Sequence, residues 1–293
     1  MTESPSLSVV VPVYNESGNI APLFAEIRDV MSTLGRTFEV IYVNDGSSDT
    51  SLAELLALQS EHPMLRVIDL AGNFGEAAAL CAGFNAAAGE LVITLDGDGQ
   101  NDPRDIPYLL AALEDGGYRV VSGWRQGRQE DVLLRVLPSR LANALIRWVT
   151  GIPLHDNGCG LKIYRRSLVH GAALPRGFNR FLPAVFGVTA AEACEVPIRD
   201  RRREHGQSHY GLGRTFAVIR DVMALPFVIH RPYGGERGSL VVAILATLYT
   251  LASRHLWTGG AVAAIAASIA WNLRRYQRAQ RDGVYRVRRE YPE

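Results

Sequence analysis

Residues 91–103, LVITLDGDGQNDP, place two aspartates directly after a short apolar run. Such a run before a turn is typical of a strand that is buried on both faces. Asp96 and Asp98 stand two residues apart at the end of this predicted strand. Their carboxylates repel each other unless one takes a proton or a cation lies between them.

A divalent cation would relieve that repulsion. Hard cations such as Mg²⁺ and Mn²⁺ prefer oxygen ligands and keep coordination positions open for phosphate oxygens. Asp96 and Asp98 therefore predict a metal-assisted diphosphate site. Aspartate pairs are also common in ordinary turns, so the interpretation depends on what surrounds this stretch.

The segments around this stretch alternate between strand-like and helix-like patterns, which predicts an α/β sheet. Right-handed crossovers bring the loops after the strands to one edge of such a sheet, where ligands bind. We expect strands at residues 7–11, 38–43, 65–70, 91–95 and 120–122, and helices at 20–34, from Asp49 to Leu58, at 76–88 and after Pro103. Further on, residues 133–149 predict a helix, and 161–164 and 194–198 predict strands.

Composition excludes several classes of protein. The 293 residues carry a net charge of +1, with 47% hydrophobic and 21% charged residues, so neither disorder nor nucleic-acid binding is indicated. Three scattered cysteines predict reduced thiols, without a disulfide framework or a zinc site. The acidic N-terminus, MTESPSLSVV, lacks the pattern of a signal peptide, and we expect the chain to begin in the cytoplasm.

The C-terminal third changes character. Residues 214–229 are amphipathic and predict an interfacial helix, or else an ordinary surface helix. Residues 239–253 and 256–273 are free of charge and predict a membrane hairpin, with a buried helical pair as the alternative. Spans of roughly 16 residues reach only about 24 Å, against a hydrocarbon core of about 30 Å, so they are short. The arginine-rich end, residues 274–293, is expected on the cytoplasmic side.

Six motifs occur in the order found in one family. The chain resembles the family 2 glycosyltransferases of the GT-A fold, in the branch of dolichyl-phosphate mannose synthase and bacterial polyprenyl-phosphate glycosyltransferases. The motifs are SVVVPVYNE (8–16), VNDGSSDTS (43–51), GNFGEAAALCAGFNAAAGE (72–90), TLDGDGQNDP (94–103), NGCGLKIYRR (157–166) and HGQSHYG (205–211). The resemblance implies a Rossmann-like, mostly parallel sheet with helices on both faces.

The resemblance also implies roles for individual residues around the donor. Pro12, Tyr14 and Glu16 would shape the nucleotide pocket, with Asp45 near the base or ribose. Further positions match the metal and diphosphate site (Asp96, Asp98, Gln100), a loop beside the sugar (Asp156, Lys162) and a segment that closes over the nucleotide (Arg201, Arg203, Ser208).

A second set of residues matches the family's binders of the acceptor phosphate. These are Arg125, Arg135 and Ser139, with Arg140 and Asn143 as neighbours, although a solvated basic face would have the same composition. With Asp98, the first three are the residues expected to act in catalysis. Arginine suits a phosphate because its planar guanidinium donates two parallel hydrogen bonds.

Three positions depart from the family pattern. His209 stands where lysine is usual, Gly99 replaces a bulkier residue, and FNRFLP (178–183) lacks the histidine often found ahead of its phenylalanine. These differences leave the reaction class intact but affect any inference about the sugar.

The predicted reaction is transfer of a sugar from a UDP- or GDP-linked donor to polyprenyl phosphate, with inversion and with Mg²⁺ or Mn²⁺. The anionic acceptor needs no protein base, and the metal offsets the charge that grows on the leaving diphosphate. A dinucleotide oxidoreductase is disfavoured because no GxGxxG follows the first strand. A processive polysaccharide synthase is disfavoured because Ala144 stands where its QxxRW element needs glutamine. An inactive membrane scaffold of the same fold is a further alternative.

These expectations divide the chain into four parts. They are a catalytic domain at 1–212 (donor half 1–123, acceptor half 124–212), an interfacial helix and linker at 213–237, two short membrane helices at 238–273 and a basic tail at 274–293. We expect a multi-pass protein of the cytoplasmic membrane, with its catalytic domain on the cytoplasmic side. The resemblance further implies a homo-oligomer, such as a tetramer.

Overall fold

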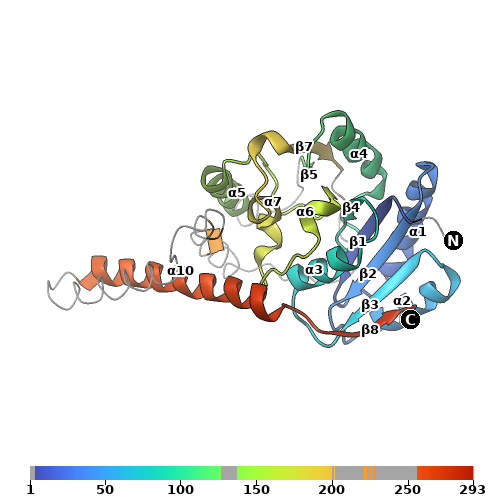
Figure 1. Cartoon of the computed structure of the whole chain (residues 1–293), viewed down its shortest axis with the longest axis horizontal. Coiled ribbons are helices and arrows are strands. Elements are labelled where there is room, and N and C mark those ends of the chain that lie inside the picture. The colour runs from blue at the N-terminus through green and yellow to red at the C-terminus, as the bar shows by residue number, and fades with distance from the viewer. Residues whose placement is uncertain are drawn as a thin grey trace.

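The computed structural model describes residues 4–126, 137–199, 201, 221–222, 225, 228 and 256–292. In the helices that begin at residues 137 and 256, side chains are described only from residues 143 and 263 onward. A mixed sheet with helices on both faces forms its centre (Figure 1). The strands are β1 (Leu7–Val13), β2 (Phe38–Asn44), β3 (Leu65–Leu70), β4 (Leu91–Thr94), β5 (Val120–Arg125), β6 (Lys162–Arg165), β7 (Ala193–Ile198) and β8 (Val287–Tyr291). The helices are α1 (Ile20–Thr33), α2 (Ser51–Glu61), α3 (Glu76–Ala86), α4 (Ile106–Asp115), α5 (Leu137–Thr150), α6 (Arg166–Val169), α7 (Leu182–Val185) and α10 (Leu256–Asp282), with 3-10 turns η1 (Pro103–Asp105), η3 (Phe178–Phe181) and η4 (Ala190–Glu192).

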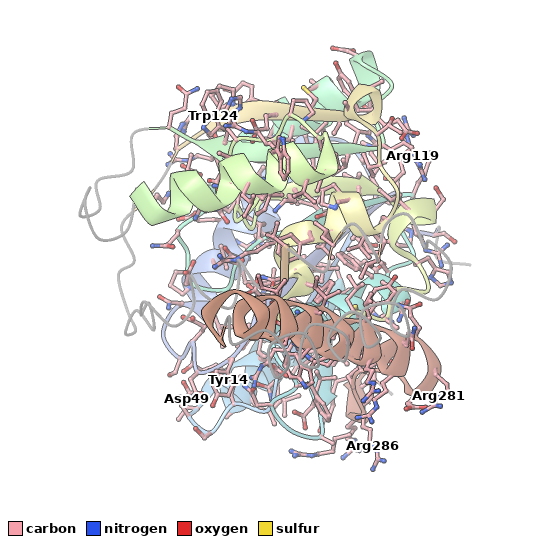
Figure 2. The ribbon with its side chains drawn as sticks, turned by 90° about the vertical axis from the view of Figure 1, so that its left-hand side faces the viewer. Tyr14, Asp49, Arg119, Trp124, Arg281 and Arg286 are labelled. Carbon is pink, nitrogen blue, oxygen red and sulfur yellow. The ribbon has the colours of Figure 1, made fainter. Side chains whose placement is uncertain are left out.

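The order of the strands fixes one functional edge of the sheet. It runs β7-β5-β6-β4-β1-β2-β3-β8, in which β4, β1, β2 and β3 are parallel and β6 is antiparallel to both β4 and β5. The carboxyl ends of β1, β2, β4 and β5 therefore meet the start of β6. Figure 2 shows Tyr14, Asp49 and Trp124 on this side of the sheet, and Arg119, at the start of β5, on the opposite side.

Both faces of the central strands are buried, which explains their continuous apolar sequences. Val10 of β1 belongs to the core under α3, while Val9 and Val11 belong to the core under α1, α2 and α4. The expected α/β sandwich of helices around a sheet is confirmed, although the sheet is mixed, with three antiparallel pairs among the described strands.

Strand β1 continues through Pro12 to Val13, two residues beyond the predicted end at residue 11. The carbonyl of Val10 accepts a hydrogen bond from the N–H of Leu95, just after β4. Backbone polar groups of every second residue in a strand point to the same side, so those of Pro12 point to the side of β4 as well. Because β4 ends at Thr94, opposite Val10, no neighbouring strand requires a donor at Pro12. The carbonyl of Pro12 instead lies against Gly97, where an added Cβ would come within 2.8 Å of it.

The C-terminal residues return to the sheet. The predicted basic tail, 274–293, is described up to residue 292; it contains the end of α10 and strand β8, which pairs antiparallel with β3. Glu290 of β8 accepts a hydrogen bond at 2.5 Å from Arg66, whose other nitrogen bonds Glu39 at 2.6 Å. The sequence pattern of β8, VRREY, places charge on an exposed edge strand, so hydrophobic periodicity alone did not reveal it.

The described residues include part of the segments that were predicted to lie in or at a membrane. Residues 239–253 lie outside the described residues, as does most of the predicted helix at 214–229 apart from 221, 222, 225 and 228. The second predicted span, 256–273, forms the first part of α10, which extends away from the sheet in Figure 1. Within the described ranges, no helix is both long enough and apolar enough to cross a membrane.

Candidate functional site

The turn after β4 holds Asp98 in a defined position at the functional edge. Asp98 is 7% exposed, and its Oδ1 accepts a hydrogen bond at 3.1 Å from the N–H of Gln100. Gly99 between them has a φ of +71°, a conformation that glycine adopts without strain and a bulkier residue does not. The departure from the family at Gly99 is therefore consistent with the backbone of this turn.

Asp96 lies among other charged groups. Burial and the carboxylates of Glu76 and Asp98 raise the pKa of Asp96 to about 8, while Arg125 and Lys162 act to lower it. The repulsion inferred from the sequence is thus present in the folded site.

The residues of this turn fit a hard divalent cation. Carboxylate and amide oxygens at Asp96, Asp98 and Gln100 are the donors that Mg²⁺ and Mn²⁺ prefer. Across the described ranges, no group of three or more His, Cys, Asp or Glu side chains is placed to hold a metal ion. A cation that takes most of its ligands from phosphates and water suits so small a protein donor set.

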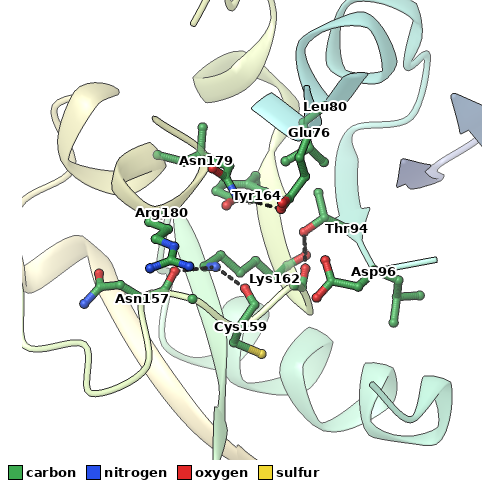
Figure 3. A pocket seen from close by; sticks show the side chains of 14 residues that line it. Glu76, Leu80, Thr94, Asp96, Asn157, Cys159, Lys162, Tyr164, Asn179 and Arg180 are labelled. Atoms are coloured by element: carbon green, nitrogen blue, oxygen red, sulfur yellow. Dashed lines mark hydrogen bonds between the residues drawn. The ribbon is translucent and has the colours of Figure 1, made fainter. Parts of the chain in front are cut away.

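Lys162, at the start of β6, is fixed beside Asp96. Its side chain is 3% exposed, and Nζ donates hydrogen bonds to the carbonyls of Asn157, at 3.2 Å, and of Cys159. Thr94 Oγ1 donates to the carbonyl of Gly160 at 2.7 Å, which ties the loop before β6 to β4. Figure 3 shows the side chains of Lys162 and Asp96 in one pocket.

Gly160 provides the space for the Asp96 carboxylate. A Cβ built on Gly160 would overlap all three carboxyl atoms of Asp96. We expect Gly160→Ala to displace Asp96, and therefore to reduce sugar transfer by about 10-fold or more, because a small misplacement in a preorganised site has effects of that size. Overpacking should also destabilise the fold by about 1–3 kcal/mol.

The double variant Asp96→Gly with Gly160→Ala separates these two effects. It removes the overlap, so its urea unfolding midpoint should return toward the wild-type value while its transfer rate stays low. Wild-type activity in Gly160→Ala would show that the position of Asp96 is not critical.

The loops after β1 and β2 are hydrogen-bonded to each other at the functional edge. Asn15, with a φ of 55°, donates its N–H to Ser47 Oγ at 3.0 Å and accepts from the N–H of Ser48 at 2.8 Å. Tyr14 is 45% exposed next to this junction, and Glu16 Oε2 accepts from Asn19 Nδ2 at 2.8 Å. Pro12, Tyr14 and Glu16 thus lie at the functional edge, where a nucleotide pocket is predicted.

Asp45 is engaged in holding the next loop. Its two carboxylate oxygens accept hydrogen bonds from the N–H groups of Phe74, at 2.7 Å, and Gly75, at 2.8 Å, directly before α3. Burial raises the pKa of Asp45, and these two hydrogen bonds act to lower it. Asp45 therefore positions the start of α3; its predicted contact with a base or ribose stays a prediction.

Arg125 and Asp156 form a buried ion pair. Nε of Arg125 lies 2.7 Å from Oδ2 of Asp156, Nη2 lies 3.1 Å from Oδ1, and each side chain is 7% exposed. The sequence placed Arg125 at the acceptor phosphate and Asp156 beside the sugar, and the structure brings the two together. Two nitrogens of the guanidinium are already occupied by the carboxylate.

Arg201 contacts the turn after β4 through both its backbone and its side chain. Its N–H donates to the carbonyl of Gln100 at 3.0 Å, and its guanidinium bonds Asp102 and Glu26, each at 2.7 Å. Although burial acts to raise the pKa of Asp102, hydrogen bonds from Arg104 and Arg201 lower it to about 2. Arg201 thus lies at the predicted diphosphate site.

Some predicted residues lie beyond what the structure describes. Arg135, Arg203, Ser208 and His209 are outside the described residues, as are the side chains of Ser139 and Arg140, while Asn143 lies half-buried on α5.

Other residues line the Asp96 pocket without having been predicted. Among them are four with polar side chains: Glu76, Tyr164, Asn179 and Arg180. Two of them, Glu76 and Tyr164, stand inside quoted motifs, and Asn179 and Arg180 stand in the divergent FNRFLP segment, so the motifs pointed to these positions without giving them a role.

The comparisons of this sequence with known proteins agree on one family. A sequence model of the family described as "Glycosyl transferase family 2" matches residues 8–171. Dodecaprenyl-phosphate galacturonate synthase of Rhizobium johnstonii is 40% identical over 258 residues, which cover 84% of this chain and 76% of that protein. Undecaprenyl-phosphate 4-deoxy-4-formamido-L-arabinose transferase of Edwardsiella ictaluri is 40% identical over 219 residues, which cover 74% of this chain and 66% of that protein, just under two thirds.

Solved structures show a similar fold. Glucosyl-3-phosphoglycerate synthase from Mycobacterium tuberculosis, in complex with Mn²⁺, uridine diphosphate and glucosyl-3-phosphoglycerate, aligns with a TM-score of 0.59 at 21% identity. The alignment covers 79% of this chain and 82% of the other. At that identity, the likeness concerns the fold alone.

Proposed function

The chain belongs to glycosyltransferase family 2, and from that premise we propose that it transfers a sugar from a nucleotide-sugar to the phosphate of a polyprenol. The observation that carries this proposal is the 40% identity, over 84% of the chain, to a dodecaprenyl-phosphate sugar synthase. The convergence of Asp96, Asp98, Arg125 and Lys162 at one sheet edge supports it.

The donor is proposed to lie along the carboxyl ends of β1, β2 and β4. Pro12, Tyr14, Glu16 and Asp45 would line the nucleotide side, and the sugar would occupy the pocket that contains Asp96 and Lys162. Arg201, Arg203 and Ser208 would close over the nucleotide. Asp96, Asp98 and Gln100 would hold Mg²⁺ or Mn²⁺, which supplies electrostatic stabilisation of the leaving diphosphate.

The acceptor phosphate is proposed to approach from the side of β5 and α5, through Arg125, Arg135, Ser139, Arg140 and Asn143. A polyprenyl phosphate is anionic at neutral pH, so its oxygen can attack the anomeric carbon without a protein base. Attack from the face opposite the diphosphate inverts the anomeric centre. An α-linked donor would then give a β-linked lipid phosphate.

Membrane attachment completes the proposal. The uncharged residues 239–253 and the first part of α10 are proposed to lie in or at the cytoplasmic membrane, with the sheet on the cytoplasmic side. Trp148 of α5 and Trp271 of α10 are 82% and 48% exposed, as is suitable for tryptophans at a membrane surface. A homo-oligomer would help short apolar helices by covering mismatched surface.

Transfer can be measured directly. Full-length protein in detergent, with Mg²⁺ or Mn²⁺, should convert undecaprenyl phosphate to a glycosylated lipid from at least one UDP- or GDP-sugar of a panel, and omission of the lipid phosphate should abolish product. Membranes washed with alkaline carbonate should retain the activity. If every donor is only hydrolysed, or none reacts, the polyprenyl phosphate acceptor is wrong.

A further inference from the structure

The pocket beside Asp96 contains hydrogen-bond donors that have no partner among the described residues. Lys162 and Arg180 both line this pocket, with Arg180 on the side opposite Asp96 (Figure 3). Arg180 is only partly exposed, and in the parts of the chain that the structure describes it makes no hydrogen bond or ion pair. A partly desolvated guanidinium without an anion is unfavourable unless a ligand supplies one.

Tyr164 provides a second, independent sign of a ligand. Its side chain is fully buried and lines the same pocket, and its hydroxyl has no hydrogen-bond partner among the described residues. Burial raises the pKa of Tyr164 well above its usual value, so the hydroxyl stays protonated and can donate. Buried polar atoms are rarely left unpaired in proteins, and this one belongs to a residue that lines the pocket.

Two carboxylates, those of Glu76 and Asp96, also line the pocket. Glu76 Oε1 accepts from Asn179 Nδ2 at 2.6 Å, which fixes this carboxylate at the pocket, and Asp96 lies across from Arg180. Carboxylates are suited to receive hydrogen bonds from sugar hydroxyls. The pocket therefore offers acceptors for hydroxyl groups on one side and donors for an anion on the other.

We infer that the donor sugar carries a carboxylate, as a hexuronic acid does, and that Arg180 and Tyr164 bind this group beside Lys162. The inference rests on the proposed function and deepens it, because the curated relatives transfer different sugars by name. A guanidinium and a carboxylate can form two parallel hydrogen bonds, and the Tyr164 hydroxyl can supply another. A neutral hexose would leave Arg180 without an anionic partner.

The same donors could instead bind a phosphate, from the lipid acceptor. The pocket walls argue against a doubly charged group, because two carboxylates, Glu76 and Asp96, line the same pocket. A single carboxylate surrounded by hydroxyls introduces less repulsion. Separate titration of donor and acceptor distinguishes the two sources.

The test uses donors that differ only at C6. The full-length protein is given UDP-galacturonate or UDP-galactose, and GDP-mannuronate or GDP-mannose, with undecaprenyl phosphate and Mg²⁺. We expect at least a tenfold higher kcat/KM for one uronate than for its neutral partner. Arg180→Gln should lower kcat/KM for that uronate by about 10- to 100-fold, the effect of a lost hydrogen bond to a charged group, and change the neutral donor by less than about threefold.

Tyr164→Phe separates ligand binding from folding. Removing an unpaired buried hydroxyl should leave the urea unfolding midpoint unchanged or higher, while uronate binding measured by calorimetry becomes about 5- to 10-fold weaker. Arg28→Gln, on the outer surface of α1, is the matched control and should change nothing.

Three results would overturn the uronate assignment. They are equal kcat/KM for both members of each pair, an equal loss for both in Arg180→Gln, and a rise in KM for undecaprenyl phosphate with no change in donor discrimination. If none of these four donors supports transfer, calorimetry with the same nucleotide-sugars still decides whether the pocket prefers a carboxylate, while the wider donor panel decides on the proposed function.

Discussion

Replacing Asp98 with alanine is expected to reduce the transfer rate by about 10³-fold or more. A divalent ion that stabilises the leaving diphosphate contributes several kcal/mol to the transition state, and each 1.36 kcal/mol corresponds to about tenfold in rate. Asp98 is the buried carboxylate of the turn after β4, and its Oδ1 already orients the backbone of Gln100. Its loss removes both a proposed metal ligand and the hydrogen bond that shapes the turn.

The measurement is initial-rate transfer at saturating Mn²⁺ and donor. Asp115→Ala, at the exposed end of α4, is the matched control and should retain wild-type activity. Recording Mn²⁺ by electron paramagnetic resonance, with the nucleotide diphosphate present, gives a second readout: the bound fraction should fall in Asp98→Ala and not in the control. Equal activity of wild type and Asp98→Ala would remove the metal assignment, whatever the effect on folding.

Much of the fold could be predicted because its central strands are buried on both faces. The apolar runs around Val10, Ile41, Ile68 and Ile93 are unambiguous in the sequence, and each lies in β1 to β4. Strand β8 could not be predicted in the same way. It is an edge strand of charged residues, and ion pairs such as Arg288 with Asp69, at 3.2 Å, accompany its pairing with β3. Contacts between residues so far apart in the chain produce no periodic pattern of apolar residues in the sequence of the strand.

The site was predictable to the extent that it depends on strand ends. Asp96 and Asp98 follow β4 directly, so the sheet topology alone brings them to the functional edge. Arg180 is different, because it comes from a 3-10 turn far along the chain, and only the packing of η3 against α3 brings it to the pocket. Pocket residues contributed by irregular segments cannot be placed from a periodic pattern.

The pairing of Arg125 with Asp156 could not have been predicted either, and it changes the meaning of a mutation at Arg125. The motif analysis gave these residues separate ligands, a phosphate and a sugar. In the fold, each side chain is 7% exposed and the two form a bidentate ion pair. An arginine whose guanidinium is needed to neutralise a buried carboxylate affects stability before it affects any substrate.

Arg125→Gln is therefore expected to destabilise the protein by about 3–5 kcal/mol, the typical effect of leaving a buried charge without its partner. Asp156→Asn should have a similar effect, because it removes the carboxylate that holds two nitrogens of the buried guanidinium. The double replacement Arg125→Met with Asp156→Leu removes both charges and should recover most of that loss, since an apolar pair of similar volume often replaces a buried ion pair without penalty. Urea unfolding followed by tryptophan fluorescence measures all three.

The surface pair of Arg119 and Glu192, at 3.3 Å and more than a third exposed on the arginine side, supplies the control for this cycle. Arg119→Gln should cost less than about 1 kcal/mol, because water solvates the glutamate that remains. If Arg125→Gln instead unfolds at the wild-type urea concentration and raises KM for undecaprenyl phosphate, Arg125 serves the acceptor and its pairing with Asp156 is incidental. If both stability and KM change in Arg125→Gln while the double variant regains stability alone, the residue performs both tasks, with the Nε and Nη2 groups held by Asp156 and the rest of the guanidinium directed to the phosphate.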